Sequence, residues 1–266
     1  MKVARIPYLN AEPFYLGWGE DPPFEVVEMV PRELGRKARS GLIDAGLMAV
    51  ADWFEVDDEF VPVSPFMGVA AREQVQSVIL FAHDPPRRLA RKRIGVTDES
   101  STSRRLLELL ARARWKIDGV TWVPESEIVG DPRETVDAML LIGDRALELA
   151  MDPDHGGWEK AIDLAAEWWS WQALPFVFAV WTVRAALPRR DRERFSGFLS
   201  GSLALGSERL AEIAADYAGL TADPDALRTY LENLVYRLGP AEQEGLQRFR
   251  DLLADFDIQE YGAERV

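Results

Sequence analysis

The 266-residue sequence contains no cysteine and only two histidines, His83 and His155. Without cysteine the chain can form no disulfide, thiolate nucleophile or cysteine-based metal site. The histidines lie far apart in the sequence, and neither has a second histidine at the spacing of paired metal ligands, so we expect no metal site. Neither of the common glycine-rich phosphate-binding loops is present.

Positive charge is also scarce, because 31 Lys and Arg residues stand against 45 Asp and Glu residues and leave a net charge of −14. Nucleic acids and anionic membranes bind basic surfaces, so neither is an expected partner. No apolar run approaches the length of a membrane span, and the signal-peptide pattern is missing, so we expect a cytoplasmic protein of unspecified oligomeric state. An anionic ligand would depend on local donors such as helix N-termini, hydroxyls or a few arginines.

Hydrophobic residues make up 47% of the sequence, which is enough for a sizeable core. Short apolar runs alternate with helical patterns through the first two thirds and predict an α/β fold, whereas the chain from Arg189 onwards has helical apolar stripes. Two long apolar strands are expected near 75–83 and 174–182. They predict two lobes, with residues 1–82 and 180–266 in lobe one, residues 83–179 in lobe two, and a ligand cleft between them.

Two polar residues stand at unexpected places in this pattern. Asn10 follows the first predicted strand, 3–7, and lies between Pro7 and Pro13 in the sequence. Asparagine is common both in turns and in ligand contacts, and the local sequence favours neither. Ser77 lies within the apolar run 75–82, where a buried hydroxyl needs a partner. That partner is either the backbone or a ligand.

Hydroxyls also cluster at Ser101, Thr102 and Ser103, between a predicted strand and a predicted helix at 100–113. Helix N-termini bind anions, and three hydroxyls exceed the one that a helix cap requires, although a simple cap at Ser100 or Ser101 is the alternative. The stretch 140–144 is a predicted strand ended by Gly143 and Asp144. These two either turn the chain and cap a helix, or lie beneath a ligand at the end of the strand.

Seven stretches taken together resemble one family. In order they read RIPYLNAEPF, SGLIDAGLMAV, VQSVILFA, SSTSRRLLELL, AMLLIGDRAL, WQALPFVFAVW and YRLGPAEQEGL. This order and spacing, over nearly the whole chain, is similar to that of the MqnA family, the chorismate dehydratases of menaquinone biosynthesis. The resemblance implies a two-lobed fold like that of type II periplasmic binding proteins, adapted to a cytoplasmic enzyme. It also implies loss of water from chorismate to give 3-[(1-carboxyvinyl)oxy]benzoate, in the futalosine route.

The resemblance assigns roles residue by residue. Asn10 and Ser77 correspond to active-site residues, and Thr102 and Ser103, beside Ser101, correspond to a site for a substrate carboxylate. The cleft lining would include Gly143, Asp144, Pro175 and Phe176. The sequence departs from the family at Glu73, where a glycine is often found nearby, and at Gln172-Ala173, where the family usually has Thr-Gly. These departures place larger or charged groups beside the expected cleft.

The implied reaction makes an aromatic ring, so its driving force is intrinsic and it requires no metal or redox cofactor. The implied site residues include no strong base, which predicts that Asn10 and Ser77 orient chorismate, a dianion, and assist the departing hydroxyl. A cytoplasmic binding protein for a small cyclic or aromatic carboxylate is the alternative function. The sister enzyme that makes dihydroxynaphthoate fits less well, because its expected histidine has no counterpart here.

Overall fold

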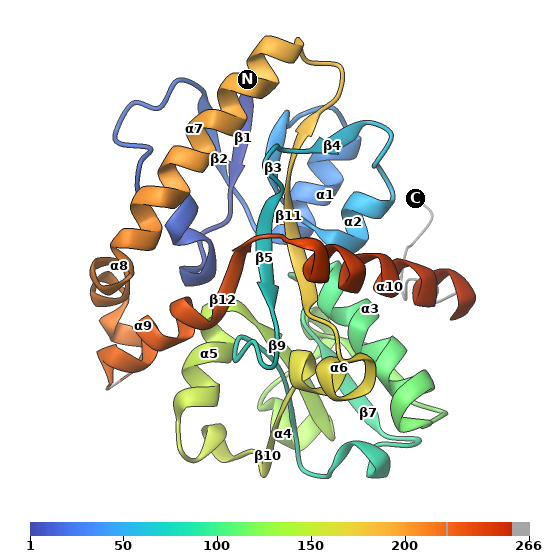
Figure 1. Ribbon diagram of the computed structural model, residues 1–266. Coiled ribbons are helices and arrows are strands. Elements are labelled where there is room, and N and C mark those ends of the chain that lie inside the picture. The colour runs from blue at the N-terminus through green and yellow to red at the C-terminus, as the bar shows by residue number, and fades with distance from the viewer. Residues whose placement is uncertain (222, 257–266) are drawn as a thin grey trace.

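The computed structural model describes residues 1–221 and 223–256, which form two lobes, each built on its own β-sheet (Figure 1). Within these residues the sheet of lobe one has seven strands. In spatial order they are β12 (Leu234–Arg237), β5 (Met67–Ala71), β11 (Phe176–Arg184), β3 (Ala45–Ala49), β1 (Lys2–Arg5) and β2 (Glu25–Glu28), with β4 (Phe60–Pro62) also paired to β11. Residues 257–266 of the predicted lobe one lie outside the described residues.

The second lobe contains a smaller sheet, of five strands in the described chain. Their order is β10 (Lys160–Asp163), β6 (Val78–Ala82), β9 (Ala138–Ile142), β7 (Arg93–Val96) and β8 (Thr121–Pro124). Strand β6 runs antiparallel to both of its neighbours, and β7 runs parallel to β8 and β9. The helices of this lobe are α3 (Ser101–Leu109), α4 (Pro132–Thr135), α5 (Gly143–Met151) and α6 (Leu164–Gln172).

Helices cover lobe one and extend to its border with lobe two. They are α1 (Pro31–Arg39), α2 (Val50–Phe54), α7 (Arg189–Glu208), α8 (Leu210–Asp216), α9 (Pro224–Asn233) and α10 (Pro240–Phe256). Proline at the first position of α1 and Ser40 and Gly41 after its end explain where this helix begins and ends. Strand β12 and helix α10 lie at the waist of the molecule, so the C-terminal segment borders both lobes (Figure 1).

The chain crosses between the lobes earlier than the sequence predicted. Sheet pairing places the first crossing after Ala71 and before Val78, and the second after Asp163 and before Phe176. Strand β6 therefore belongs to lobe two and the whole of β11 to lobe one, whereas the predicted limits were 82/83 and 179/180. The strand that leads into the first crossing is β5, whose small residues, MGVAA, carry a weak strand signal.

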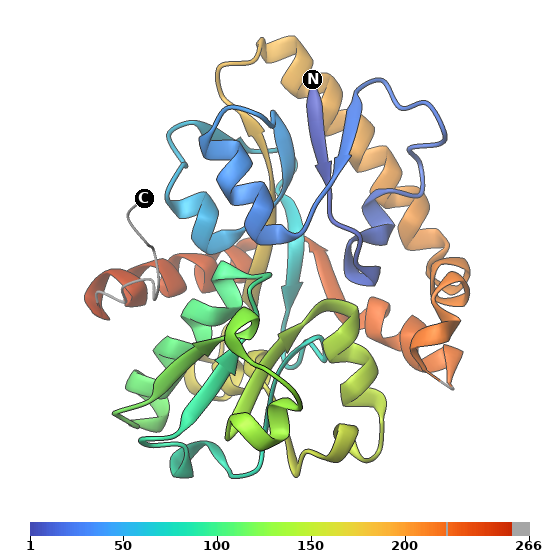
Figure 2. The same ribbon diagram turned by 180° about the vertical axis from the view of Figure 1, so that it is seen from behind.

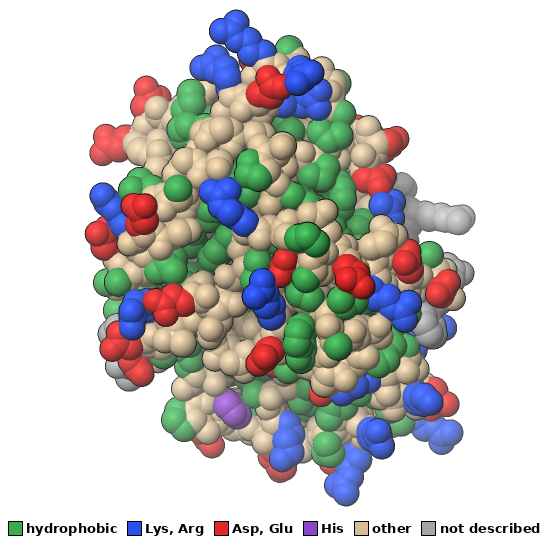
Figure 3. Space-filling model, in the orientation of Figure 1, with side chains coloured by type: hydrophobic (Ala, Val, Ile, Leu, Met, Phe, Trp, Pro, Cys, Tyr) green, Lys and Arg blue, Asp and Glu red, His purple; other side chains and the backbone are tan. Residues whose placement is uncertain are grey.

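Ser77 is consequently not in the middle of a strand. It lies in the first crossing, directly before β6, and follows Gln76, whose φ of 59° is left-handed. Seen from behind, helices α1 and α2 of lobe one face α3 of lobe two across the border between the lobes (Figure 2). Acidic and basic side chains are interspersed on the face in Figure 3. In the described part of the chain, no helix is both long and apolar enough to cross a membrane.

Candidate functional site

A cavity of about 60 Å³ lies between the lobes. Its walls are mostly apolar and come from β3, β5, β6, β9 and β11, from the segment that follows β1, from the starts of α1 and α3 and from the first crossing. Five polar side chains line it, namely Tyr8, Asn10, Ser77, Ser100 and Ser103. Asn10 and Ser77, 67 positions apart in the printed sequence, thus face one space. No Lys or Arg is among its described lining residues, so any anion bound there would meet hydroxyl and amide donors only.

Asn10 is held in a short 3-10 helix, Leu9–Phe14, that follows β1. Glu12 in this helix accepts hydrogen bonds from Arg5 (2.5 Å) and from the Tyr217 hydroxyl (3.0 Å). The Leu9 N–H donates across the border to Asp144 Oδ1 at 2.9 Å. The turn that carries Asn10 is therefore anchored to lobe one by an ion pair and to lobe two by a hydrogen bond.

Ser77 is fully buried, and its hydroxyl has protein partners on both sides. It accepts a hydrogen bond from the Tyr230 hydroxyl (2.9 Å) and donates to the Val75 carbonyl at 3.4 Å. The Ser77 carbonyl accepts from the Gly143 N–H (2.9 Å). Sequence reasoning missed Tyr230, because its spacing from Leu227 and Leu231 on α9 is that of an ordinary core stripe.

The hydroxyls at the start of α3 have different surroundings. Ser100 caps the helix, accepting from the Ser103 N–H (3.2 Å) and donating to Ser103 Oγ (3.1 Å), and both serines line the cavity. Thr102 Oγ1 instead accepts from the Ala51 N–H (3.0 Å) and joins α3 to lobe one. Ser101 Oγ is buried and has no hydrogen-bond partner among the described residues. Of the three predicted hydroxyls, the structure thus brings Ser103 to the cavity.

Gly143 and Asp144 lie at the end of β9, as predicted, and meet the segment before Asn10. Gly143 has a φ of 63°, and a Cβ there would lie 3.2 Å from the Tyr8 ring. The Tyr8 hydroxyl donates to Glu99 Oε2 at 2.6 Å, and burial together with this bond raises the pKa of Tyr8. These contacts join the two lobes around the cavity.

The carboxyl of Asp144 has a raised pKa. Burial raises its pKa to about 6, the hydrogen bond from Leu9 acts in the opposite direction, and the nearby Glu12 and Glu99 raise it further. Asp144 is not itself part of the cavity lining in the described structure. Its side chain instead connects lobe two to the backbone beside Asn10.

Pro175 and Phe176 lie outside the described cavity lining, whereas Phe178 lines the cavity. The Phe176 ring packs edge-on against Trp168 and Phe249, at 5.2 and 4.9 Å between ring centroids. The register of β11 with β5 shifts between Val177 and Ala179. Such an irregularity re-aims side chains and cannot be read from the period-two pattern of the sequence.

The residues that depart from the family pattern also lie away from the cavity. Glu73 is exposed in the first crossing, and Gln172 accepts a hydrogen bond from Arg248 (2.9 Å) at the end of α6. Ala173 ends this helix with a left-handed φ of 54°. None of the three is among the described lining residues.

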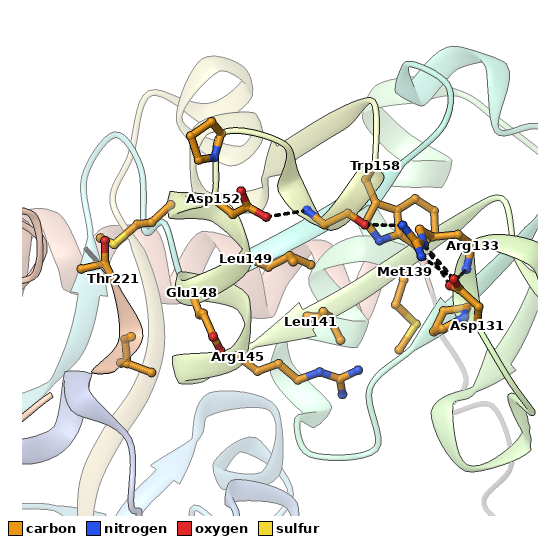
Figure 4. Close-up of a pocket in the computed structure, with 15 residues that line it drawn as sticks. Asp131, Arg133, Met139, Leu141, Arg145, Glu148, Leu149, Asp152, Trp158 and Thr221 are labelled. Atoms are coloured by element: carbon orange, nitrogen blue, oxygen red, sulfur yellow. Dashed lines mark hydrogen bonds and ion pairs between the residues drawn. The ribbon is translucent and has the colours of Figure 1, made fainter. Parts of the chain in front are cut away.

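A larger hollow, of about 660 Å³, lies on the surface of lobe two around α5 and reaches Thr221 (Figure 4). Most of its charged groups already have protein partners. Arg133 donates to Asp131 and to the Gly156 carbonyl, and Asp152 accepts from the Gly156 N–H (3.1 Å). Within the described residues, no group of three or more His, Cys, Asp or Glu side chains could hold a metal ion. The interlobe cavity is therefore the better candidate for chemistry.

Comparison with known proteins shows the family of the chain. The sequence model of a family described as menaquinone biosynthesis matches residues 1–255. The chain is similar to a chorismate dehydratase from Thermus thermophilus, at 32% identity over 245 residues, which cover 86% of this chain and 87% of the relative.

Solved structures show the same architecture. One is a protein from Archaeoglobus fulgidus, with a TM-score of 0.78, 20% identity and coverage of 96% of this chain and 97% of that chain. Another is the periplasmic aliphatic sulphonate binding protein of Escherichia coli, with a TM-score of 0.63, 15% identity and coverage of 97% and 87%. The predicted two-lobed fold of the periplasmic-binding-protein type is confirmed.

Proposed function

Since this chain belongs to the menaquinone biosynthesis family, we propose that it is a chorismate dehydratase, a hydro-lyase that converts chorismate to 3-[(1-carboxyvinyl)oxy]benzoate and water. The observation that carries the proposal is the meeting of Asn10 and Ser77 in one cavity between the lobes. The 32% identity to a chorismate dehydratase over most of both chains supports the same substrate.

The chemistry matches the groups that the cavity offers. The ether-bearing ring carbon loses its hydrogen, the bonding pair forms a ring double bond, and the neighbouring hydroxyl leaves, so that proton and hydroxide together make water. Because the product ring is aromatic, the protein needs to supply mainly orientation and hydrogen bonds to the departing groups. Asn10 and Ser77 supply these bonds, and a substrate carboxylate or a held water receives the proton.

The substrate carboxylates require binding groups that are not cationic. Ser103, with Ser100 and the N-terminal amides of α3, is placed to bind one carboxylate, because a helix N-terminus carries partial positive charge. Thr102 contributes by joining α3 to the Ala51 backbone. This arrangement explains how a protein of net charge −14 could hold a dianion.

We expect Ser103→Ala to raise KM for chorismate about tenfold, because one hydrogen bond to a charged carboxylate is lost, and to change kcat much less. Ser207→Ala is the control, since Ser207 donates only to the Leu203 carbonyl on α7, away from the cavity. Steady-state kinetics on both variants measures the difference. An unchanged KM in the Ser103 variant would exclude this carboxylate site.

Substrate entry requires the lobes to separate. The cavity of about 60 Å³ is far smaller than ordinary ligand pockets, which measure roughly 300–1,000 Å³. Several hydrogen bonds cross the border beside it, among them those from Tyr8 to Glu99, from Leu9 to Asp144 and from Ala51 to Thr102. We infer that the structure represents the closed form and that these bonds form on closure.

Closure should depend on pH through Asp144. In the closed structure its pKa is about 6, above the ordinary value, because burial and the nearby Glu12 and Glu99 outweigh the hydrogen bond from the Leu9 N–H. Opening would return the carboxyl to water and lower this pKa, so the closed form binds the proton more tightly and closure is favoured at low pH. We expect kcat/KM to fall as the pH increases through about 6. Asp144→Asn, whose amide oxygen accepts the same bond without titrating, should lose this inflection. Asp152→Asn is the control, because Asp152 accepts backbone N–H bonds outside the cleft.

The same group affects stability in the same direction. Its folded pKa of about 6 lies above the ordinary value, so the folded protein binds the proton more tightly than the unfolded chain. The contribution of Asp144 to the free energy of unfolding is therefore largest below about pH 4 and declines as the pH rises to about 6. A pH–rate profile without the inflection in the wild type would contradict the role of Asp144 in closure.

The decisive experiment is incubation of the purified protein with chorismate, with the aromatic product followed by absorbance and mass spectrometry. Formation of 3-[(1-carboxyvinyl)oxy]benzoate supports the dehydratase. Chorismate binding without product would overturn it in favour of a binding protein, the function of the Escherichia coli structural relative.

A further inference from the structure

Asp163 lies where the two crossings between the lobes come together. It is the last residue of β10, where the second crossing begins, and it pairs with Ile79 of β6 in the antiparallel ladder. This pairing places Asp163 beside the end of the first crossing, which leads into β6 at Val78. Its half-buried side chain is therefore within reach of both connecting segments.

The two carboxylate oxygens of Asp163 bond different segments. Oδ1 accepts hydrogen bonds from the Ala165 and Ala166 N–H groups, at 2.8 and 3.1 Å, and caps α6. Oδ2 accepts from the Val75 and Gln76 N–H groups of the first crossing, at 2.9 and 2.7 Å. A helix cap requires only one oxygen, so the second contact is not explained by capping.

These four bonds make the carboxylate hard to displace. Burial raises the pKa of the Asp163 carboxyl, and the four backbone N–H groups oppose the rise. If either crossing moved away, a half-buried carboxylate would lose two of its donors, which is costly away from water. Asp163 therefore fixes the backbone of the first crossing relative to the start of the second.

The bonded part of the first crossing forms a wall of the cavity. Val75, Ser77 and Val78 line it. Gln76 lies between them with a left-handed φ of 59°, which is unfavourable for a non-glycine residue and persists only where the surroundings hold it. The Val75 carbonyl in turn accepts from the Ser77 hydroxyl at 3.4 Å. Asp163 thus holds both residues that precede Ser77, including the acceptor of its hydroxyl.

We propose that Asp163 is a positioning residue that keeps Ser77 directed at the cavity by holding the backbone of the first crossing. Asp163 is not among the described lining residues, so it acts through the crossing and not on the substrate. The inference rests on the proposed dehydratase function, which gives Ser77 its part in the reaction. Without the bonds to Oδ2, Gln76 can leave the left-handed region and Ser77 can turn away.

Asp163→Ser separates the two contacts, because a serine hydroxyl still caps α6 but has no second oxygen for the first crossing. We expect kcat for chorismate to fall about 10- to 100-fold, since small misplacements of an acting group have effects of this size. KM should stay within about threefold, because Ser103 and the start of α3 are not touched. A purely structural role would lower the melting temperature and leave kcat unchanged.

The matched control is Asp223→Ser, the same substitution at another helix cap. Asp223 caps α9 by accepting from the Asp225 N–H at 3.0 Å. Both kinetic constants of this variant should stay within about twofold of the wild type. An equal loss of kcat in both variants would show that capping alone matters and would overturn the positioning role.

Amide hydrogen exchange, followed by NMR, tests the contact without turnover. In the wild type the Gln76 N–H should exchange at least about tenfold more slowly than in an unstructured chain, because it is bonded to a carboxylate. Asp163→Ser should remove this protection and leave that of the Ala166 N–H within about threefold.

Rapid exchange of the Gln76 N–H in the wild type would overturn the proposal without any variant. An unchanged kcat in a folded, active Asp163→Ser protein would overturn it as well. If the variant loses protection at Gln76 but the wild type does not dehydrate chorismate, the proposed function fails and the contact between Asp163 and the first crossing stands.

Discussion

Asn10→Ala is expected to lower kcat for chorismate dehydration by about 100- to 1,000-fold, the usual cost of removing a positioned hydrogen-bonding group from a site excluded from water. The effect should fall on kcat, because the cavity walls that hold the ring are apolar and Ser103 remains to bind the carboxylate. The fold should survive, since the turn around Asn10 is anchored through Glu12 and the Leu9 backbone. Steady-state kinetics with chorismate measures the loss.

Asn233→Ala is the matched control, because this asparagine is exposed at the end of α9. It should leave kcat within about twofold of the wild type, as surface substitutions away from special contacts do. If Asn10→Ala also kept turnover within a few-fold of the wild type, Asn10 would have no direct part in the reaction. Asn10 would then serve only to turn the chain.

Gly143→Ala should give the second large effect, a fall in kcat/KM of about 100-fold. Its left-handed φ of 63° costs a non-glycine residue about 1–2 kcal/mol of folding free energy. The new methyl would lie 3.2 Å from the Tyr8 ring, so this ring must shift. Tyr8 lines the cavity and joins the lobes through Glu99, and its displacement therefore disturbs both substrate placement and closure.

Gly19→Ala separates backbone strain from the contact with Tyr8. Gly19 has the same φ of 63°, but a methyl there would meet nothing within 4 Å. Denaturant unfolding should show a similar loss of about 1–2 kcal/mol for both variants, whereas only Gly143→Ala should lose activity. Equal kinetics in the two variants would show that the contact between Gly143 and Tyr8 does not matter for the reaction.

Local sequence patterns predicted most of the elements that build the lobes. Helix Pro31–Arg39 begins at a proline and is followed by polar residues, which is a typical helix signal. The apolar runs of β9 and β11 are typical of strands. The assignment of β6 to lobe one was wrong. Every residue of β6 is buried, and a continuous apolar run does not say which neighbours a strand pairs with.

Some residues of the candidate site could likewise be predicted from the sequence, and others could not. Motif order pointed to Asn10, Ser77, Ser103 and Gly143, and the fold brings all four to one cavity. Phe176 was predicted to line the cleft, but the irregular register of β11 places Phe178 there. Tyr8 and Tyr230 had no local signal that distinguished them from core residues.

The sequence by itself determined the α/β class, the two-lobed division and the family, because periodicity and motif order are properties of neighbouring residues. Only the tertiary structure decided which hydroxyls face the cavity, where the chain crosses between the lobes, and which group bonds the Ser77 hydroxyl. The physical reason is distance along the chain. Tyr230 donates to Ser77 across 153 positions, and Asp144 accepts from Leu9 across 135, and no local pattern encodes such contacts.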